Sequence, residues 1–124
     1  MPDRDRAPGS IARFYLDSGK RYTYIVFMDI LRFEWDRRKD KANIRKHGIS
    51  FREARAVFYD EHAVQFYDPD HSEEEDRFVL IGMSIKLRVV VVCHCFREDE
   101  LVVRIISARK ANRSEEKDYW RQRR

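Results

Sequence analysis

The stretch from Phe33 to Gly48 reads F-E-W-D-R-R-K-D-K-A-N-I-R-K-H-G and decides the first part of the fold. Its opening residues fit a strand, and Asp36 can then cap the N-terminus of a helix. Gly48 supplies the left-handed residue that ends such a helix after His47. The sequence therefore predicts a strand from Ile30 to Trp35, followed at once by this helix.

A second helix is predicted directly after the first. Ser50 and Glu53 have the spacing of a capping box, in which each side chain satisfies the backbone amide of the other residue. Apolar residues recur at helical spacing beyond this start and predict a buried stripe. The stripe comprises Phe51, Ala54, Val57 and Phe58.

The remainder alternates between strands and turns until a last helix. Strands are predicted from Ala63 to Tyr67, Arg77 to Met83, Lys86 to Phe96 and Glu100 to Ser107, with short hairpin links between the last three. The run V-V-V-V-C is apolar on both faces and predicts a central strand. Residues 68–76, D-P-D-H-S-E-E-E-D, form an acidic loop too charged to be buried. Asn112 and Glu115 open the C-terminal helix.

These elements predict an α+β fold. Helices pack on a twisted, mainly antiparallel sheet of about four to five strands, with two helices after the first strand and one at the C-terminus. The chain has 124 residues, 43% of them hydrophobic, which suffices for one core. Although 39% of the residues are charged, the net charge is +4, which favours separate acidic and basic patches and raises nucleic acid among the partners.

The first 27 residues differ from the rest. They begin M-P-D-R-D-R-A-P-G-S, with two prolines, a glycine and alternating charges, which argues against regular structure. We therefore predict that residues 1–27 are a flexible extension, or follow from a start codon assigned too early, and that residues 28–124 form one domain. The alternative is an edge strand, because Tyr22 to Phe27 is rich in β-prone residues.

The cellular setting follows from cysteine usage and hydropathy. Cys93 and Cys95 share one face of a predicted strand and His94 the other, so a disulfide framework is not expected. The cysteines are predicted to be small buried side chains and not metal ligands, since no second ligand pair stands at zinc spacing. No run approaches the roughly 18 apolar residues that span a bilayer. Asp3 and Asp5 stand where a signal peptide would be basic. We expect a soluble, cytoplasmic protein.

Arginines near the end of the last predicted strand are the first candidates for a site. Arg104 interrupts the apolar run L-V-V-R-I-I-S, where a half-buried guanidinium needs an anion. That anion is either a phosphate or a carboxylate such as Glu34 or Glu53. Arg109 and Lys110 follow just past the predicted strand end, where chain segments often frame a site. Their alternative is a solvated basic turn.

The first helix supplies further candidates. Lys39, Asn43 and His47 recur every fourth residue and are predicted to share one helical face, with Lys46 beside them. Such a face can bind a phosphate, orient it and exchange a proton. Alternatively, Asn43 and His47 cap backbone groups at the C-terminus of the helix.

The chemistry that these residues favour is phosphate chemistry. Arg77 opens a strand after the acidic loop and is a further candidate, although it can instead pair with Glu74 or Glu75 at the surface. The chain has no P-loop, no dinucleotide fingerprint and no G-x-S-x-G motif, so no cofactor is expected. Its Lys, Arg and His side chains suit metal-independent RNA cleavage. In that reaction a base activates the 2′-hydroxyl, cations stabilise the phosphorane and an acid protonates the 5′-oxygen.

Three motifs resemble the BrnT toxin family. They are F-E-W-D-x-x-K-x-x-x-N-x-x-K-H-G-I-S-F-x-E-A, R-x-x-x-I-G-x-S and R-I-I-S-A-R-K-A-N-x-x-E, in order between Phe33 and Tyr119. The resemblance implies a RelE-like fold and an endoribonuclease toxin that stops translation. It also implies a BrnA-type ribbon-helix-helix antitoxin that neutralises the toxin in a hetero-oligomer and carries it to operator DNA.

The resemblance also carries site residues over by position. The family's polar motif positions here are Lys39, Asn43, His47, Arg77, Arg104, Ser107, Arg109 and Glu115. On this basis Arg104 and Arg109 are expected to stabilise transition-state charge, and Lys39 to bind phosphate. Proton transfer is assigned to His47 or Lys39, and substrate positioning to Arg77. Further substrate contacts are assigned to Asn43, Lys46, Ser107 and Lys110.

Two other functions remain open at the level of sequence. The first is a non-catalytic protein of the same fold whose basic face only docks the antitoxin. The second is a nucleic-acid-binding module without chemistry, against which the absence of an aromatic stacking motif counts.

Overall fold

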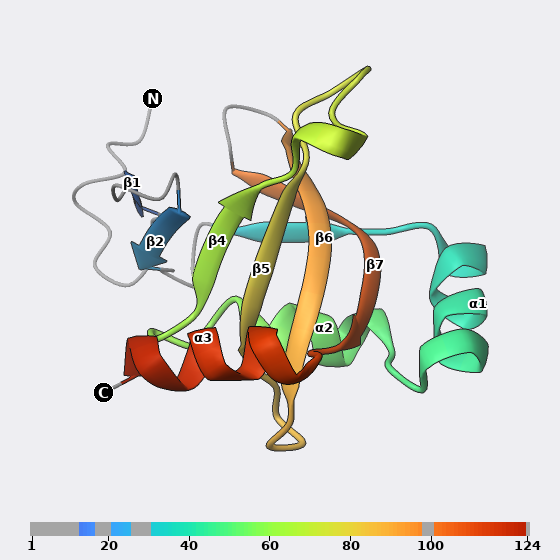
Figure 1. The fold of residues 1–124 in the computed structure, drawn as a ribbon. Helices are drawn as coiled ribbons and strands as arrows, with labels where there is room; N and C mark the ends of the chain where they lie inside the picture. Colours follow the sequence, from blue (N-terminus) through green and yellow to red (C-terminus); the bar gives the residue numbers. More distant parts are fainter. Residues whose placement is uncertain (1–12, 17–20, 26–30, 98–100, 124) are drawn as a thin grey trace.

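A computed structural model describes residues 13–16, 21–25, 31–97 and 101–123 of the chain, with side chains from residue 31 onward. The elements are β1 (Arg13–Leu16), β2 (Arg21–Ile25), β3 (Arg32–Glu34), α1 (Arg37–His47), α2 (Phe51–Val57), β4 (Val64–Tyr67), a 3-10 helix (Pro69–His71), β5 (Phe78–Met83), β6 (Val89–Arg97), β7 (Val102–Lys110) and α3 (Arg113–Arg123). Figure 1 shows α3 across one face of the sheet, α2 behind the other and α1 beyond β7.

The sheet has the strand order β1-β2-β4-β5-β6-β7-β3. All neighbouring strands are antiparallel except β3 and β7, which run parallel. The apolar strand β6 lies between β5 and β7, and its residues 89–92 are buried. The predicted α+β fold, the mainly antiparallel sheet and the central position of the V-V-V-V-C strand are thereby confirmed.

The caps predicted for α1 are present. The Asp36 carboxylate accepts hydrogen bonds from the amides of Arg38 and Lys39, at 2.8 and 3.3 Å. Gly48 adopts φ 70° and its amide donates to the Ile44 carbonyl, which ends the helix in the left-handed region. These caps are local, so α1 begins and ends where the sequence predicts.

Asn43 attaches α1 to the sheet. Its amide oxygen accepts from the Ala108 amide at 3.1 Å, and its nitrogen donates to the carbonyls of Ala108 and Ile49, both at 2.8 Å. β3 pairs with β7 only along residues 102–104. Asn43 therefore satisfies the backbone of β7 further along the same edge, where strand pairing has ended.

The core on one face of the sheet is built by α2. Phe51, Ala54, Val57 and Phe58 are fully buried against β5, β6 and β7, which confirms the predicted stripe. Only half of the predicted capping box forms: the Ser50 hydroxyl accepts from the Glu53 amide at 3.0 Å.

The Glu53 carboxylate forms an ion pair with Arg88 and does not complete the capping box. It accepts from Nε and Nη2 of Arg88 at 2.7 and 2.6 Å, and from the Ser84 hydroxyl at 2.7 Å. A charge-assisted, bidentate ion pair is stronger than a hydrogen bond to a single backbone amide, so Glu53 pairs with the distant Arg88 and not with the nearby Ser50 amide. The reciprocal half of the capping-box prediction was wrong for this reason.

The other face of the sheet is covered in part by α3. Tyr119 is fully buried there with Ile81, Val89 and Val91. The hydroxyl of Tyr119 donates to the Asp60 carboxylate at 2.6 Å. At the start of α3, Asn112 and Glu115 bond each other's amides, both at 2.8 Å, which confirms the predicted helix start.

Several strand boundaries differ from their predictions. β6 begins at Val89 and not at Lys86, because a five-residue turn closes through a bond from the Ser84 amide to the Arg88 carbonyl. β7 continues to Lys110, so Arg109 and Lys110 belong to the strand and do not follow it. β4 and β5 each begin one residue after their predicted starts.

The N-terminal region contributes backbone pairing. β2 pairs with β4 and lies where the alternative prediction placed a strand between Tyr22 and Phe27. Residues 1–12, 17–20 and 26–30 lie outside the described residues, as do Ile30, where the first strand was predicted to start, and the link through residues 98–100. The division at residue 28 stays a prediction. Among the described helices, none is long and apolar enough to cross a membrane.

Candidate functional site: a pocket on the sheet face

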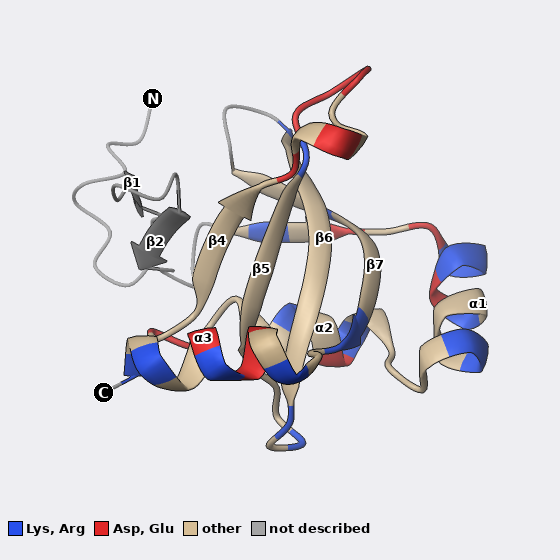
Figure 2. Ribbon diagram, in the orientation of Figure 1, with Lys and Arg blue, Asp and Glu red and all other residues tan. Residues whose placement is uncertain are grey.

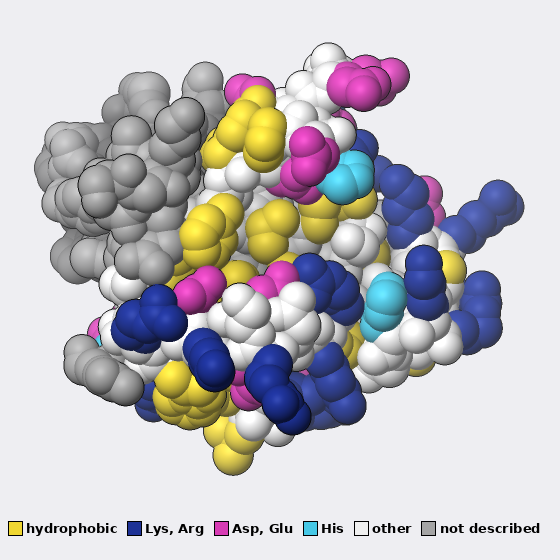
Figure 3. Space-filling model, in the orientation of Figure 1, with side chains coloured by type: hydrophobic (Ala, Val, Ile, Leu, Met, Phe, Trp, Pro, Cys, Tyr) yellow, Lys and Arg dark blue, Asp and Glu magenta, His cyan; other side chains and the backbone are white. Residues whose placement is uncertain are grey.

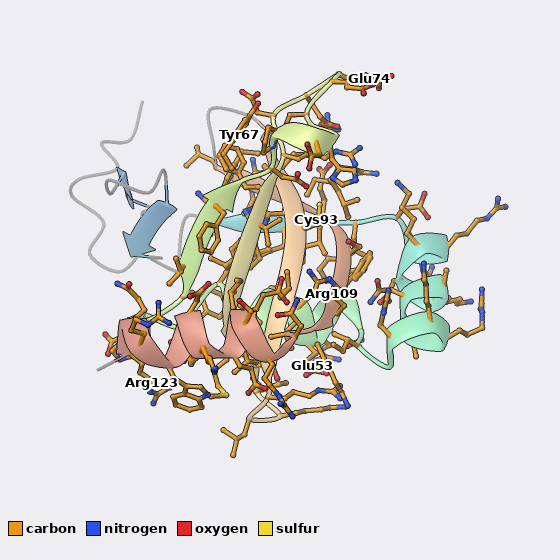
Figure 4. The ribbon with its side chains drawn as sticks, viewed as in Figure 1. Glu53, Tyr67, Glu74, Cys93, Arg109 and Arg123 are labelled. Carbon is orange, nitrogen blue, oxygen red and sulfur yellow. The ribbon has the colours of Figure 1, made fainter. Side chains whose placement is uncertain are left out.

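A pocket of about 260 Å³ lies on the sheet face that α3 covers in part; we call it the sheet pocket. Neighbouring strands build its floor from two rows of paired residues. One row is Val79, Cys93 and Ser107, and Val91 pairs with Arg109 in the other. The lining comprises Asp68, His71, Arg77, Val79, Val91, Cys93, Ile106, Ser107 and Arg109. Figure 4 shows Cys93 and Arg109 on this face, above α3.

The acidic loop delivers a histidine and a carboxylate to the pocket rim. Asp68 and Arg77 close the loop through a bond from the Asp68 amide to the Arg77 carbonyl at 2.9 Å. The Ser72 hydroxyl donates to the Asp68 carbonyl and accepts from the Arg77 amide. Pro69 opens the 3-10 turn that brings His71 back over Asp68, with 2.9 Å between Nδ1 and the carboxylate. Asp68 thereby orients the imidazole, leaving Nε2 for another partner.

Arg77 brings an unsatisfied donor to the pocket. Its Nε is buried and has no hydrogen-bond partner in the part of the chain that the structure describes. The alternative ion pair with Glu74 or Glu75 does not form; instead, Glu75 lies 3.6 Å from Arg97. A buried guanidinium N–H without an acceptor is costly, and a bound phosphate oxygen would remove that cost.

Arg109 is held at the pocket edge by the start of α3. Its Nη1 and Nη2 donate to the two oxygens of Glu115, each at 2.8 Å. The Glu115 hydrogen bonds raise the pKa of Arg109, and Arg109 in turn lowers the pKa of the Glu115 carboxyl. The guanidinium is therefore fixed in place, and the donors that Glu115 leaves free can meet an anion.

The cysteine prediction is confirmed for Cys95, which is buried and free, whereas Cys93 is half-buried on the pocket floor. Burial raises the pKa of the Cys93 thiol and raises that of Cys95 to about 11, so both thiols are protonated at neutral pH. His94 lies on the opposite face, against Phe58. Within the described ranges, His, Cys, Asp and Glu side chains form no group of three or more that could hold a metal ion.

The structure places Arg104 outside the pocket lining. Its Nη1 donates to the Glu34 carboxylate at 2.8 Å, across the parallel pair of β3 and β7. Arg97 approaches the same carboxylate at 3.6 Å. Of the two alternatives for Arg104, an internal ion pair and a bound phosphate, the carboxylate is the partner observed.

The α1 candidates also lie outside the pocket lining. Asn43 is 6% exposed and its side chain makes three backbone hydrogen bonds, which does not fit direct contact with a substrate. The face shared by Lys39, Asn43 and His47 is thus the face that packs on the body, with the two outer residues on its margins. Lys46 is exposed on α1. Lys110, next to Arg109 on β7, is exposed and does not line the pocket.

The pocket therefore brings together three of the predicted residues, Arg77, Ser107 and Arg109, and adds a pair that the sequence analysis missed. His71 and Asp68 were treated as part of a solvated acidic loop. The three-residue spacing in D-P-D-H, with proline at the second position, is the signal that predicts such a pair. Between the acidic loop and α3, Figure 3 shows hydrophobic side chains with a histidine just below the loop and a Lys or Arg side chain near the start of α3.

Chemically, the sheet pocket combines cations with a proton-transfer group. Two guanidinium groups can bind the oxygens of one phosphate, and the Ser107 hydroxyl can add a hydrogen bond. Histidine is the side chain suited to exchange a proton near neutral pH. Figure 2 shows Asp and Glu concentrated in the loop above the sheet and Lys and Arg concentrated on α1.

The pocket residues Asp68 to Arg109 fall within the match to a known family. The model of that family, described as the ribonuclease toxin BrnT of type II toxin–antitoxin systems, matches residues 35–115. The crystal structure of the Brucella abortus ribonuclease toxin BrnT is similar, at 24% sequence identity and a TM-score of 0.49, and the match covers 67% of this chain and 99% of that chain. No curated protein matches the chain.

Proposed function

The chain belongs to the family of BrnT ribonuclease toxins of type II toxin–antitoxin systems, and we propose that it cleaves RNA in the sheet pocket. The observation that carries this assignment is the convergence of His71, Arg77 and Arg109 on one pocket. These side chains supply a proton acceptor and two positive charges, of which Arg109 is held in place by Glu115. Endonucleolytic cleavage of RNA needs these functions at the scissile phosphate.

In the proposed reaction, His71 acts as the general base. Nδ1–H donates to Asp68, so Nε2 carries the lone pair that takes the proton from the ribose 2′-hydroxyl. The 2′-oxygen then attacks phosphorus. The 5′-oxygen leaves and takes a proton from solvent, to which His71 later releases the proton that it accepted, so the products are a 2′,3′-cyclic phosphate and a 5′-hydroxyl.

The two arginines act on the charge that builds up in this step. Arg109, fixed by Glu115, and Arg77, with its unsatisfied Nε, would donate to the non-bridging oxygens of the phosphorane. Ser107 would hold the substrate beside them. Because arginine and histidine can supply both the charge and the proton transfer, we propose that the reaction is independent of metal ions.

The biological setting is proposed from the family. An antitoxin partner follows from the type II class, and we propose a BrnA-like ribbon-helix-helix protein that also carries the complex to operator DNA. RNA cleavage by the free toxin would inhibit translation in the cytoplasm. The two arginines beside the pocket are also cations that an acidic antitoxin segment could cover.

The experiment that tests the proposed reaction uses a short RNA with a single 2′-deoxynucleotide at the mapped cleavage position. With EDTA present, the unmodified RNA should be cut and its 5′ product should end in a 2′,3′-cyclic phosphate, while the substituted RNA stays intact. Cleavage of both RNAs would exclude attack by the 2′-hydroxyl. Loss of all cleavage in EDTA, restored by Mg²⁺, would exclude metal independence.

A further inference from the structure

α1 presents an unpaired cationic ridge that the proposed reaction does not use. Arg37, Lys41 and Arg45 recur every fourth residue and therefore line up on one side of the helix. We call these three residues the α1 ridge. All three are exposed, and none of them forms an ion pair with any residue that the structure describes.

The α1 ridge points away from the body of the protein. Asn43, the buried residue of α1, lies about half a helical turn around the axis from the ridge. The one acidic residue of α1, Asp40, does not pair with the ridge; its carboxylate accepts a hydrogen bond from the Phe51 amide at 2.8 Å. Figure 2 shows the resulting basic outer side of α1.

This arrangement works against the stability of α1. Like charges four residues apart repel each other on a helix. Arg37 also stands in the first turn, at the positive end of the helix dipole, with Arg38 beside it. The C-terminal α3 has the same spacing of cations in Arg113, Lys117 and Arg121, but interleaves them with acidic residues. Within the described part of the chain no acidic residue pairs with the α1 ridge, and an external anion would relieve the repulsion between its cations.

The residue types of α1 indicate which kind of anion the ridge would bind. Its sequence, R-R-K-D-K-A-N-I-R-K-H, contains no aromatic residue on which an unpaired base could stack. The α1 ridge is about 12 Å long, at 1.5 Å per residue, and so extends over several phosphates. Double-helical RNA hides its bases and is bound mostly through its backbone and shape. We propose that the α1 ridge binds the phosphate backbone of a double-helical RNA segment.

This inference rests on the proposed function and specifies its substrate. α1 and the sheet pocket share β7: Asn43 bonds Ala108, and the residues on either side, Ser107 and Arg109, line the pocket. Because α1 and the pocket are both built on β7, an RNA bound to the α1 ridge through a duplex could reach the pocket with an adjoining single strand. The substrate class is an RNA in which the cleaved single strand adjoins a duplex.

The test compares two variants of the full chain. The first, Arg37→Gln/Lys41→Gln/Arg45→Gln, neutralises the α1 ridge. The matched control, Arg113→Gln/Lys117→Gln/Arg121→Gln, removes the same charge at the same spacing from α3. Binding is measured by fluorescence anisotropy against a short RNA duplex and one of its strands, both 2′-O-methylated so that attack by the 2′-oxygen is blocked, over a series of NaCl concentrations.

Wild type and the α3 control should bind the duplex more tightly than the single strand. The ridge variant should bind the duplex roughly tenfold more weakly than wild type. Its plot of log affinity against log salt concentration should be shallower by about 2 to 3 units of slope, as expected for three lost phosphate contacts. Its melting temperature should not fall, because repulsion is removed. Lys41→Gln alone should give a smaller loss in the same direction.

Equal duplex binding by wild type and the ridge variant would overturn the inference, as would tighter binding of the single strand. A ridge variant that keeps duplex binding but no longer co-purifies with the product of the adjacent gene would make the ridge a protein interface, which also overturns it. Because the probes resist cleavage, these results are independent of the nuclease test. Failure of RNA cleavage would leave duplex binding by the ridge unaffected. Failure of duplex binding would leave RNA cleavage in the pocket unaffected.

Discussion

Arg109 and Glu115 form a two-point ion pair, with both N···O distances 2.8 Å, that ties the end of β7 to the first turn of α3. Glu115 also accepts the Asn112 amide at 2.8 Å, so the carboxylate is itself fixed by the cap of α3. An arginine anchored in this way keeps its position when the pocket is empty. Electrostatic stabilisation of a transition state depends on such preorganisation.

Replacing Arg109 by lysine keeps the charge but removes the planar two-point geometry. We expect RNA cleavage to fall by roughly tenfold to a hundredfold, because an ammonium cannot hold both Glu115 and a phosphate oxygen. The measurement is the rate of cleavage of a short RNA. Arg113→Lys, an exposed change at the start of α3, is the control and should cut like wild type. Equal rates for the two variants would rule out this role for Arg109.

The buried His94 predicts a dependence of stability on pH. Burial lowers its pKa to about 4, from an ordinary value of 6.5. Its Nδ1 donates to the Val92 carbonyl at 3.0 Å, and Nε2 lies 2.8 Å from Oε1 of Gln65, whose amide nitrogen is buried without a hydrogen-bond partner in the described part of the chain. A neutral ring has one N–H, so Nε2 needs a donor, which Gln65 supplies when its amide nitrogen faces the ring.

The sign of the effect follows from this lowered pKa. Between pH 6.5 and 4 the unfolded chain binds a proton at His94 and the folded chain does not, so stability falls as the pH falls. The full loss is about 3 kcal/mol. Urea unfolding of wild type and His94→Gln should show this difference between pH 7 and pH 4. If the difference in free energy of unfolding between the two proteins did not change with pH, His94 would not be a buried neutral imidazole.

How far the sequence predicts this fold depends on the range of each interaction. The limits of α1 follow from Asp36 and Gly48, which act within one helical turn, and both were predicted correctly. The Arg104–Glu34 ion pair depends on the register of two strands seventy residues apart, so the sequence left it as one of two alternatives. Glu53 was assigned to a local capping box because Arg88 is distant in the chain.

In the candidate site, too, the sequence predicts local features better than long-range contacts. The spacing of four residues between Lys39, Asn43 and His47 predicts a shared face of α1, but spacing alone does not tell which face of a helix is buried. Asn43 turned out to bind the β7 backbone. The pocket residue His71 lies in a loop whose acidic composition predicts a solvated surface, whereas its three-residue spacing from Asp68 is the feature that indicates their contact.

The Glu53–Arg88 pair should be a large contributor to stability. Arg88→Met would leave the Glu53 carboxylate, which is 2% exposed, without its cation, and should destabilise the fold by about 3 kcal/mol. Arg52→Met, on the exposed side of α2, should change stability by less than about 0.5 kcal/mol. Urea unfolding at pH 7 measures both. A loss of the same small size in Arg88→Met would refute the pairing.

The same pair has a second pH signature. The Arg88 hydrogen bonds lower the pKa of the Glu53 carboxyl below its usual value of 4.5. Its stabilisation is therefore complete above that value and is lost as the pH falls through the lowered pKa. The stability gap between wild type and Arg88→Met should therefore narrow as the pH falls below 4.5.

Asn43 should matter for folding more than for RNA contact. Asn43→Ala leaves the Ala108 amide and carbonyl and the Ile49 carbonyl without their partner, and should cost about 3 kcal/mol. Ile44→Ala, at the exposed neighbouring position, should cost less than about 1 kcal/mol. Thermal unfolding of the two variants decides the point. A fully stable Asn43→Ala that has lost RNA affinity would restore the substrate-binding role.

The central claim is that the sheet pocket, with His71 at its rim, is the nuclease centre. The most direct measurement is cleavage of total RNA in EDTA by wild type, His71→Ala and Arg104→Ala, each shown to be folded by its thermal transition. Wild type and Arg104→Ala should cut the RNA, and His71→Ala should leave it intact. Cleavage by His71→Ala at the wild-type rate, or loss of cleavage in a folded Arg104→Ala, would contradict the assignment and move the site toward β3.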